Sequence, residues 1–166
     1  MKVHKKYFTL IVFILYLILL CWLILFKLVT SPEMIPNMRN INLVPFAESV
    51  IVNGKIYFKE IIYNILAFVP LGVYLSIIKK DWSLWEKVIV VFGLSLLFEI
   101  TQYIFALGGS DITDIITNTL GGILGIEVFS LFRRVFKEKT ICIINILGIV
   151  IEICAICLLV LLVLAN

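Results

Sequence analysis

The sequence predicts an all-α polytopic membrane protein, built as one domain over residues 1–166 from a bundle of five transmembrane helices. Apolar residues make up 63% of the chain and charged residues 15%, whereas soluble domains average about 45–50% and about 25%. The mean hydropathy is +1.17. Five apolar stretches approach or exceed the roughly 20 residues that a helix needs to cross a bilayer. This composition excludes an ordinary soluble domain and a disordered chain.

The five predicted spans are Phe8–Phe26, Ile61–Ile78, Val88–Leu107, Ile115–Phe132 and Ile141–Ala165. The first follows a basic start but exceeds the apolar run of about 7–15 residues in a cleaved signal peptide, so we expect a retained anchor. In the second, we expect a structural role for Pro70, because proline interrupts helical hydrogen bonding. The fifth is the most uniformly apolar.

A long connection, from about residue 29 to residue 60, links the first two spans. Ser31–Pro32 is expected to break the helix, and Asn53–Gly54 has the composition of a tight turn. Residues 41–46 mix apolar and polar side chains in a piece too short to cross the membrane. We expect the connection to be partly interfacial or re-entrant and packed against the bundle.

Basic residues near the ends of the spans predict how the chain lies in the membrane. Ten of the fourteen Lys and Arg residues lie in three segments that five spans would place on one side: Lys2, Lys5, Lys6, Lys79, Lys80, Lys87, Arg133, Arg134, Lys137 and Lys139. We therefore expect a cytoplasmic N-terminus and an extracellular C-terminus. Basic residues in this pattern indicate topology rather than nucleic-acid binding.

Polar side chains of the spans gather at one depth. Glu99 and Gln102 are three residues apart and share a helix face, and Asn64 lies near the start of the second span. In the predicted topology these groups fall in the outer half of the membrane or at its outer edge. Because polar groups in hydrocarbon are costly, we expect a ligand-binding cavity open to the outer face and formed by Asn42, Asn64, Glu99, Gln102, Asp114 and Asn118.

A seam of polar and small residues runs along the fourth span. Its members are spaced 3, 4, 3 and 4 residues apart, which places on one helix face Asp111, Asp114, Asn118, Gly121 and Gly125. Gly121 and Gly125 form a GxxxG pattern, so we expect them to have a structural role in close helix packing. If the site performs acid–base chemistry, the candidate catalytic residues are Glu99, Asp111 and Asp114.

These polar residues also have structural interpretations. Asn64 and Gln102 could form hydrogen bonds between helices, and Asp111 and Asp114 could cap a helix. Glu99 must be protonated, paired with a cation or placed in a wet cavity. The four cysteines lie within apolar runs and are interpreted as packing residues, so no cofactor is expected, and no metal site is predicted.

Four segments resemble, in order, the VanZ-like family of bacterial membrane proteins: Asn42–Phe46, Asn64–Gly72, Phe98–Gln102 and Asp111–Gly122, continuing to Gly125. We assign the family core to about residues 8–132 and place the C-terminal helix, 141–165, outside it. Many members carry an arginine just before the first aspartate of the last segment, where this chain has residues 107–110. The resemblance implies a place in the bacterial plasma membrane, a role in the cell envelope and resistance to teicoplanin.

Two functions compete. In the first, a non-enzymatic protein binds a lipid-linked cell-wall precursor or a lipoglycopeptide in the outer-leaflet cavity. In the alternative, a membrane enzyme modifies a lipid or cell-wall group with Glu99, Asp111 or Asp114 as acid–base residues. A transporter is less favoured, because one chain lacks symmetric halves and a dimer would have to supply them. The expected surroundings are the lipid bilayer, and an oligomer is compatible with the sequence.

Overall fold

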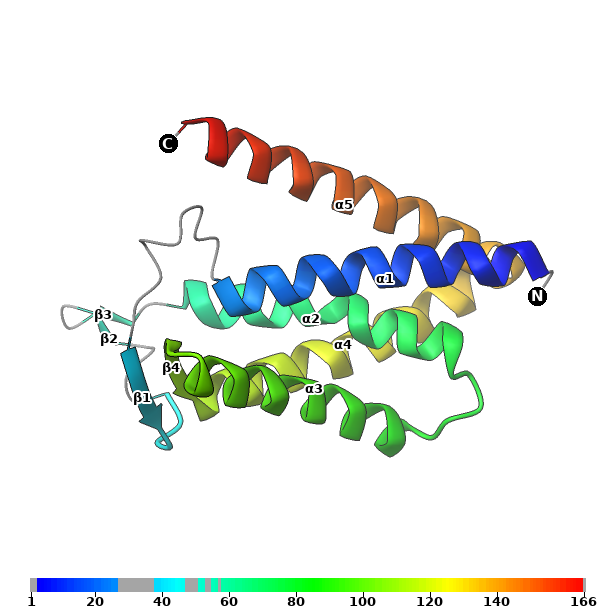
Figure 1. Cartoon of the computed structure of the whole chain (residues 1–166). Coiled ribbons are helices and arrows are strands. Elements are labelled where there is room, and N and C mark those ends of the chain that lie inside the picture. Colours follow the sequence, from blue (N-terminus) through cyan, green and yellow to red (C-terminus); the bar gives the residue numbers. More distant parts are fainter. Residues whose placement is uncertain (1–2, 27–37, 47–50, 53–54, 57, 166) are drawn as a thin grey trace.

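A computed structural model describes residues 3–26, 38–46, 51–52, 55–56 and 58–165 (Figure 1). The described chain is largely helical, as predicted. Its long helices are α1 (Val3–Phe26), α2 (Lys59–Ile78), α3 (Leu84–Ile104), α4 (Ile112–Phe136) and α5 (Thr140–Ala165). The helix break expected at Ser31–Pro32 and the turn expected at Asn53–Gly54 lie outside the described residues.

Four segments of the described chain are long and apolar enough to cross a membrane: Lys5–Phe26, Lys59–Ile78, Leu84–Ile104 and Ile112–Leu161. The last has 50 residues and includes α4, the short 3-10 helix η2 (Lys137–Lys139) and most of α5. By length and hydropathy the described chain thus offers four spanning segments, where the sequence pattern predicts five. The prediction of a helical membrane protein is confirmed at this coarser level.

Two short sheets correct the expectation of an all-α chain. Strand β1 (Met38–Asn42) pairs in parallel with β4 (Leu107–Asp111), and Asn42 lies opposite Asp111. Strands β2 (Ile51–Val52) and β3 (Lys55–Ile56) form an antiparallel pair. Pairing with β4 gives hydrogen-bond partners to backbone groups of the long connection. Helical periodicity in the sequence does not predict such a pairing of distant strands.

The third helix is displaced from its predicted bounds, Val88–Leu107. It begins four residues earlier, at Leu84, where Ser83 and Glu86 form a capping box. It ends at Ile104 because Ala106 has a φ of 54° and Gly108 a φ of 157°, which a right-handed helix cannot contain. The residues that follow therefore form β4 instead of a last helical turn.

Helices α2 and α4 are in close contact through glycines. A Cβ added at Gly121 would overlap the carbonyl oxygen of Ile65, and one added at Gly125 would overlap that of Val69. On the other side of the contact, a Cβ at Gly72 would overlap the carbonyl oxygen of Gly122. The packing role predicted for the GxxxG pattern thus agrees with the geometry, because only glycine lets these backbones approach so closely.

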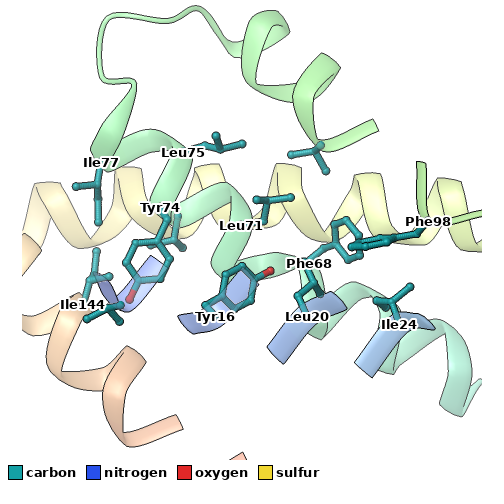
Figure 2. Packing of buried hydrophobic residues seen from close by; sticks show 13 residues of the cluster. Tyr16, Leu20, Ile24, Phe68, Leu71, Tyr74, Leu75, Ile77, Phe98 and Ile144 are labelled. Carbon is teal, nitrogen blue, oxygen red and sulfur yellow. The ribbon is translucent and has the colours of Figure 1, made fainter. Parts of the chain in front are cut away.

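A cluster of buried apolar side chains lies around α2 (Figure 2). From α2 it takes Phe68 and Leu71, which are almost fully buried. Leu20 of α1 and Phe98 of α3 complete this part of it, with the Phe68 and Phe98 rings edge to face and their centroids 6.2 Å apart. Pro70 lies inside α2, and the helix continues through it to Ile78.

Helix α5 contacts the bundle through its first half. The Asn145 amide donates a hydrogen bond to the Thr9 hydroxyl of α1 at 2.9 Å, and both residues are buried. Ile144 belongs to the same apolar cluster as Leu20 of α1 and Phe68 of α2. Toward its C-terminus, α5 diverges from α1 (Figure 1).

Candidate functional site

The candidate site lies at the end of the bundle that carries β1 and β4, called here the sheet end. Helices α2 and α4 begin at this end and α3 terminates there (Figure 1). Residues predicted for the site from four separate elements are therefore brought to one end: Asn42 of β1, Asn64 of α2, Glu99 of α3 and Asp114 of α4. The depth of these residues in the membrane stays a prediction.

Asp111 is at the centre of the first group of contacts. It is the N-cap of α4, and its Oδ1 accepts a hydrogen bond from the backbone N–H of Thr113 at 2.7 Å. Its Oδ2 accepts a hydrogen bond from the Asn42 amide at 3.0 Å. Its own backbone N–H donates to Oε2 of Glu99 at 2.9 Å. One aspartate thus joins β1, α3 and the start of α4.

Glu99 is 4% exposed and is held in place from two directions. Its carboxylate accepts the hydrogen bond from Asp111, and its backbone carbonyl accepts one from the Ser110 hydroxyl at 2.7 Å. Both contacts connect α3 to β4. Strand β4 therefore holds both Glu99, through these hydrogen bonds, and Asn42, through its pairing with β1. The sequence does not reveal this contact, because Glu99 belongs to α3 and Ser110 to β4.

A second group lies on the seam predicted along α4. The Asn64 amide donates a hydrogen bond to Oδ1 of Asp114 at 2.7 Å, which links α2 to α4. One turn further along, the Asn118 amide donates to the Ser95 hydroxyl at 2.9 Å, and both residues are fully buried. These contacts join neighbouring helices inside the bundle, which is the structural role that polar residues commonly have in membrane proteins.

Gln102 is the predicted site residue that the structure directs elsewhere. Its amide nitrogen donates a hydrogen bond to the carbonyl oxygen of Ile24 at 3.0 Å. Ile24 lies in the last turn of α1, where backbone carbonyls lack a partner within the helix. Gln102 thus supplies a hydrogen-bond partner to a carbonyl group at the end of α1. Although Gln102 and Glu99 share a helix face, they do not belong to the same group of contacts.

A hollow of about 250 Å³ lies against the Asp111 group. Four polar residues contribute to its lining, namely Asn42, Glu99, Ser110 and Asp111, but almost all of the surface that faces the hollow is apolar. The rest of its lining is largely apolar and comes from β1, the residue after it, α3 and α4: Ile41, Leu43, Leu96, Ile100, Tyr103, Ile112 and Ile115. Of the predicted ligand-binding residues, Asn42 and Glu99 line this hollow, whereas Asn64, Gln102, Asp114 and Asn118 do not.

Hydroxyl side chains are the part of the site that sequence reasoning missed. Ser110 and Ser95 hold Glu99 and Asn118, and the Thr113 hydroxyl accepts a hydrogen bond from the backbone N–H of Phe46 at 2.9 Å. Ser95 had a signal, since it precedes Glu99 by four residues and therefore shares its helix face. Serine and threonine are common enough in apolar helices that this signal alone identifies no site.

The segment that matches known proteins includes the candidate site and ends before α5. The family model described as VanZ/LLP1 matches residues 13–133, which include the whole sheet end and exclude α5. Protein VanZ of Enterococcus faecium is 42% identical over 127 residues, which are 75% of this chain and 75% of that protein. No solved structure matches the chain. With most of its length matched by the family model and by this relative, the chain belongs to the VanZ/LLP1 family of membrane proteins.

Proposed function

We propose that this protein acts in the bacterial cell envelope and gives resistance to teicoplanin and related lipoglycopeptides. In this proposal the hollow at the sheet end binds a lipid-linked cell-wall precursor or the lipophilic drug itself. One observation carries the proposal: a hollow with an almost wholly apolar surface lies directly against the hydrogen-bonded polar group of Asn42, Glu99 and Asp111. The kinship with Protein VanZ supports the same role.

For this function we propose a topology of five spans, with the N-terminus in the cytoplasm and the sheet end outside. The 50-residue segment of α4 and α5 would measure about 75 Å as one helix, far more than the roughly 30 Å of hydrocarbon in a bilayer. Figure 1 shows α5 running back alongside the bundle, which supports two crossings. Lys79 and Lys80 directly follow α2, and Arg133 and Arg134 lie in the last turn of α4. Both of these helix ends lie at the opposite end of the bundle from the sheets (Figure 1).

The lining of the hollow suits an amphiphilic ligand. A carboxylate oxygen can accept hydrogen bonds from sugar hydroxyls or ammonium groups, and the carboxylate proposed for this contact is that of Glu99, which lies beside the hollow. The apolar residues of α3 and α4 offer a surface to a hydrocarbon chain. Acid–base catalysis is less well supported, because both carboxylate oxygens of Asp111 accept hydrogen bonds that hold β1 and α4 in position.

The test measures teicoplanin susceptibility of cells that express the protein, per unit of membrane-inserted protein. We expect Glu99→Gln and Leu96→Trp to lose resistance, the first by removing the carboxylate beside the hollow and the second by filling the hollow. Glu127→Gln is the matched control, because Glu127 is an exposed carboxyl of α4 outside the hollow. Full resistance in both hollow variants at normal abundance would contradict the proposal.

A further inference from the structure

A second cavity, of about 300 Å³, lies between α5 and the helices α1, α2 and α4. It is separate from the hollow at the sheet end, since the two share no lining residue. Its walls are mainly aliphatic, with Leu20, Leu23, Val73, Leu147 and Ile151 among them. Its volume is at the lower end of the range of small-molecule sites, about 300–1,000 Å³.

Three side chains that line this apolar cavity carry a polar group: Tyr16, Tyr74 and Glu152. Glu152 of α5 is 7% exposed and forms no hydrogen bond or ion pair with the described residues. Tyr74 of α2 is 2% exposed, and its buried hydroxyl has no hydrogen-bond partner among the described residues. The Tyr16 hydroxyl, from the same cavity wall, differs because it donates to the carbonyl oxygen of Ala67 at 2.8 Å.

The fold brings Tyr74 and Glu152 to one side of the cavity. The Tyr74 hydroxyl lies so close to Gly148 of α5 that a Cβ added to Gly148 would overlap it. Figure 2 shows the same ring directed toward the α5 side of the cluster, near Ile144. Glu152 follows Gly148 by four residues and so lies one turn along the same face of α5. Glycine at 148 leaves room for the phenol to approach the carboxyl.

We propose that this cavity binds a lipophilic amine, a hydrocarbon chain that ends in an ammonium group and enters from the bilayer. A buried carboxyl within a span requires a proton, a cation or a wet cavity, and no basic side chain lines this one. An ammonium group has three donors and no acceptor, so it can donate to both the Glu152 carboxylate and the Tyr74 oxygen. The aliphatic walls then surround the hydrocarbon chain.

Helix α5 contributes part of this site, and α5 lies outside the segment that the family model matches. The family match ends at residue 133, whereas Gly148 and Glu152 are contributed by α5. The first half of α5 is held to α1 by the contact of Asn145 with Thr9, and the second half diverges (Figure 1). The cavity therefore lies on the side of α5 that faces the bundle, next to the part of the helix that separates from it.

The experiment measures equilibrium binding of radiolabelled dodecylamine and dodecanol to the full chain in lipid nanodiscs, with binding to empty nanodiscs subtracted. We expect saturable binding of the amine, at least tenfold tighter than that of the alcohol. Glu152→Gln should weaken amine binding at least tenfold, and Tyr74→Phe several-fold. Glu127→Gln and Tyr63→Phe are the controls and should bind as the natural chain does, since neither residue lines the cavity and both are exposed.

Three results would overturn the proposal: no saturable binding of dodecylamine, equal binding of amine and alcohol, or unchanged amine binding by Glu152→Gln. The fold of each variant is checked by helical circular dichroism and gel filtration. If Glu152→Gln fails to fold, Ala155→Phe tests the site instead, because Ala155 lines the cavity and a larger side chain there should exclude the ligand. Retained amine binding by a folded Ala155→Phe variant would equally contradict it.

Discussion

The contact of α2 with α4 predicts that a single methyl group at Gly121 destabilises the protein. A Cβ at this position would lie 2.9 Å from the carbonyl carbon of Ile65 and 3.0 Å from its Cα, and it would overlap the carbonyl oxygen. Ordinary carbon–carbon contacts lie at about 3.5–4.0 Å, so the two helices must move apart by roughly 0.5–1 Å. The atoms in the way belong to the backbone and cannot rotate aside.

From this geometry we expect Gly121→Ala to lower the free energy of unfolding by about 1–3 kcal/mol, the usual cost of overpacking. The matched control is Gly93→Ala in α3, where an added Cβ meets nothing within 4 Å. Alanine is favoured over glycine within a helix by about 0.5–1 kcal/mol, so this variant should be neutral or slightly more stable.

The assay is reversible unfolding of the purified protein in mixed micelles, titrated with sodium dodecyl sulfate and followed by circular dichroism. The difference between the two alanine variants removes the general effect of replacing glycine in a helix. If Gly121→Ala is as stable as Gly93→Ala, the helices are not in the close contact described, and the reasoning from the GxxxG pattern fails.

Three further predictions concern resistance, stability and topology. Glu99→Gln should abolish resistance while membrane abundance and unfolding free energy stay near those of the natural chain; an active variant at normal abundance would make Glu99 a structural residue. Asn64→Ala should cost about 1–3 kcal/mol in the same unfolding assay, because the buried Asp114 carboxylate loses the 2.7 Å hydrogen bond from α2; an unchanged midpoint would contradict this. Reporter fusions at Met1 and Asn166 should lie on opposite sides of the membrane, and fusions on the same side would refute five spans.

Much of the candidate site could be predicted from the sequence because its signals are local. Asp111 and Asp114 stand out as carboxylates where an apolar helix begins, and Asp111 indeed caps α4. The spacing of Asp114, Asn118 and Gly121 places them on one face whatever the rest of the fold, because the helical period fixes that relation. A carboxyl such as Glu99 is conspicuous in a span because of its cost there.

The partners of these residues could not be predicted, because they depend on which faces of distant helices meet. Gln102 shares a face with Glu99, yet it bonds to the carbonyl oxygen of Ile24 in α1. Asn118 has the seam spacing of Asp114, but its partner is Ser95 of α3. Nothing in the local pattern of α3 or α4 specifies which neighbouring helix lies against each position.

The sequence by itself determined that this chain is a helical membrane protein, which residues are polar within it and which glycines allow close packing. Those properties follow from hydropathy and from the helical repeat, and both act over a few residues. The tertiary structure decided that β1 pairs with β4, so that Asn42 reaches Asp111, and that α5 places Glu152 near Tyr74. Such contacts join residues far apart along the chain, and only the packing of whole elements brings them together.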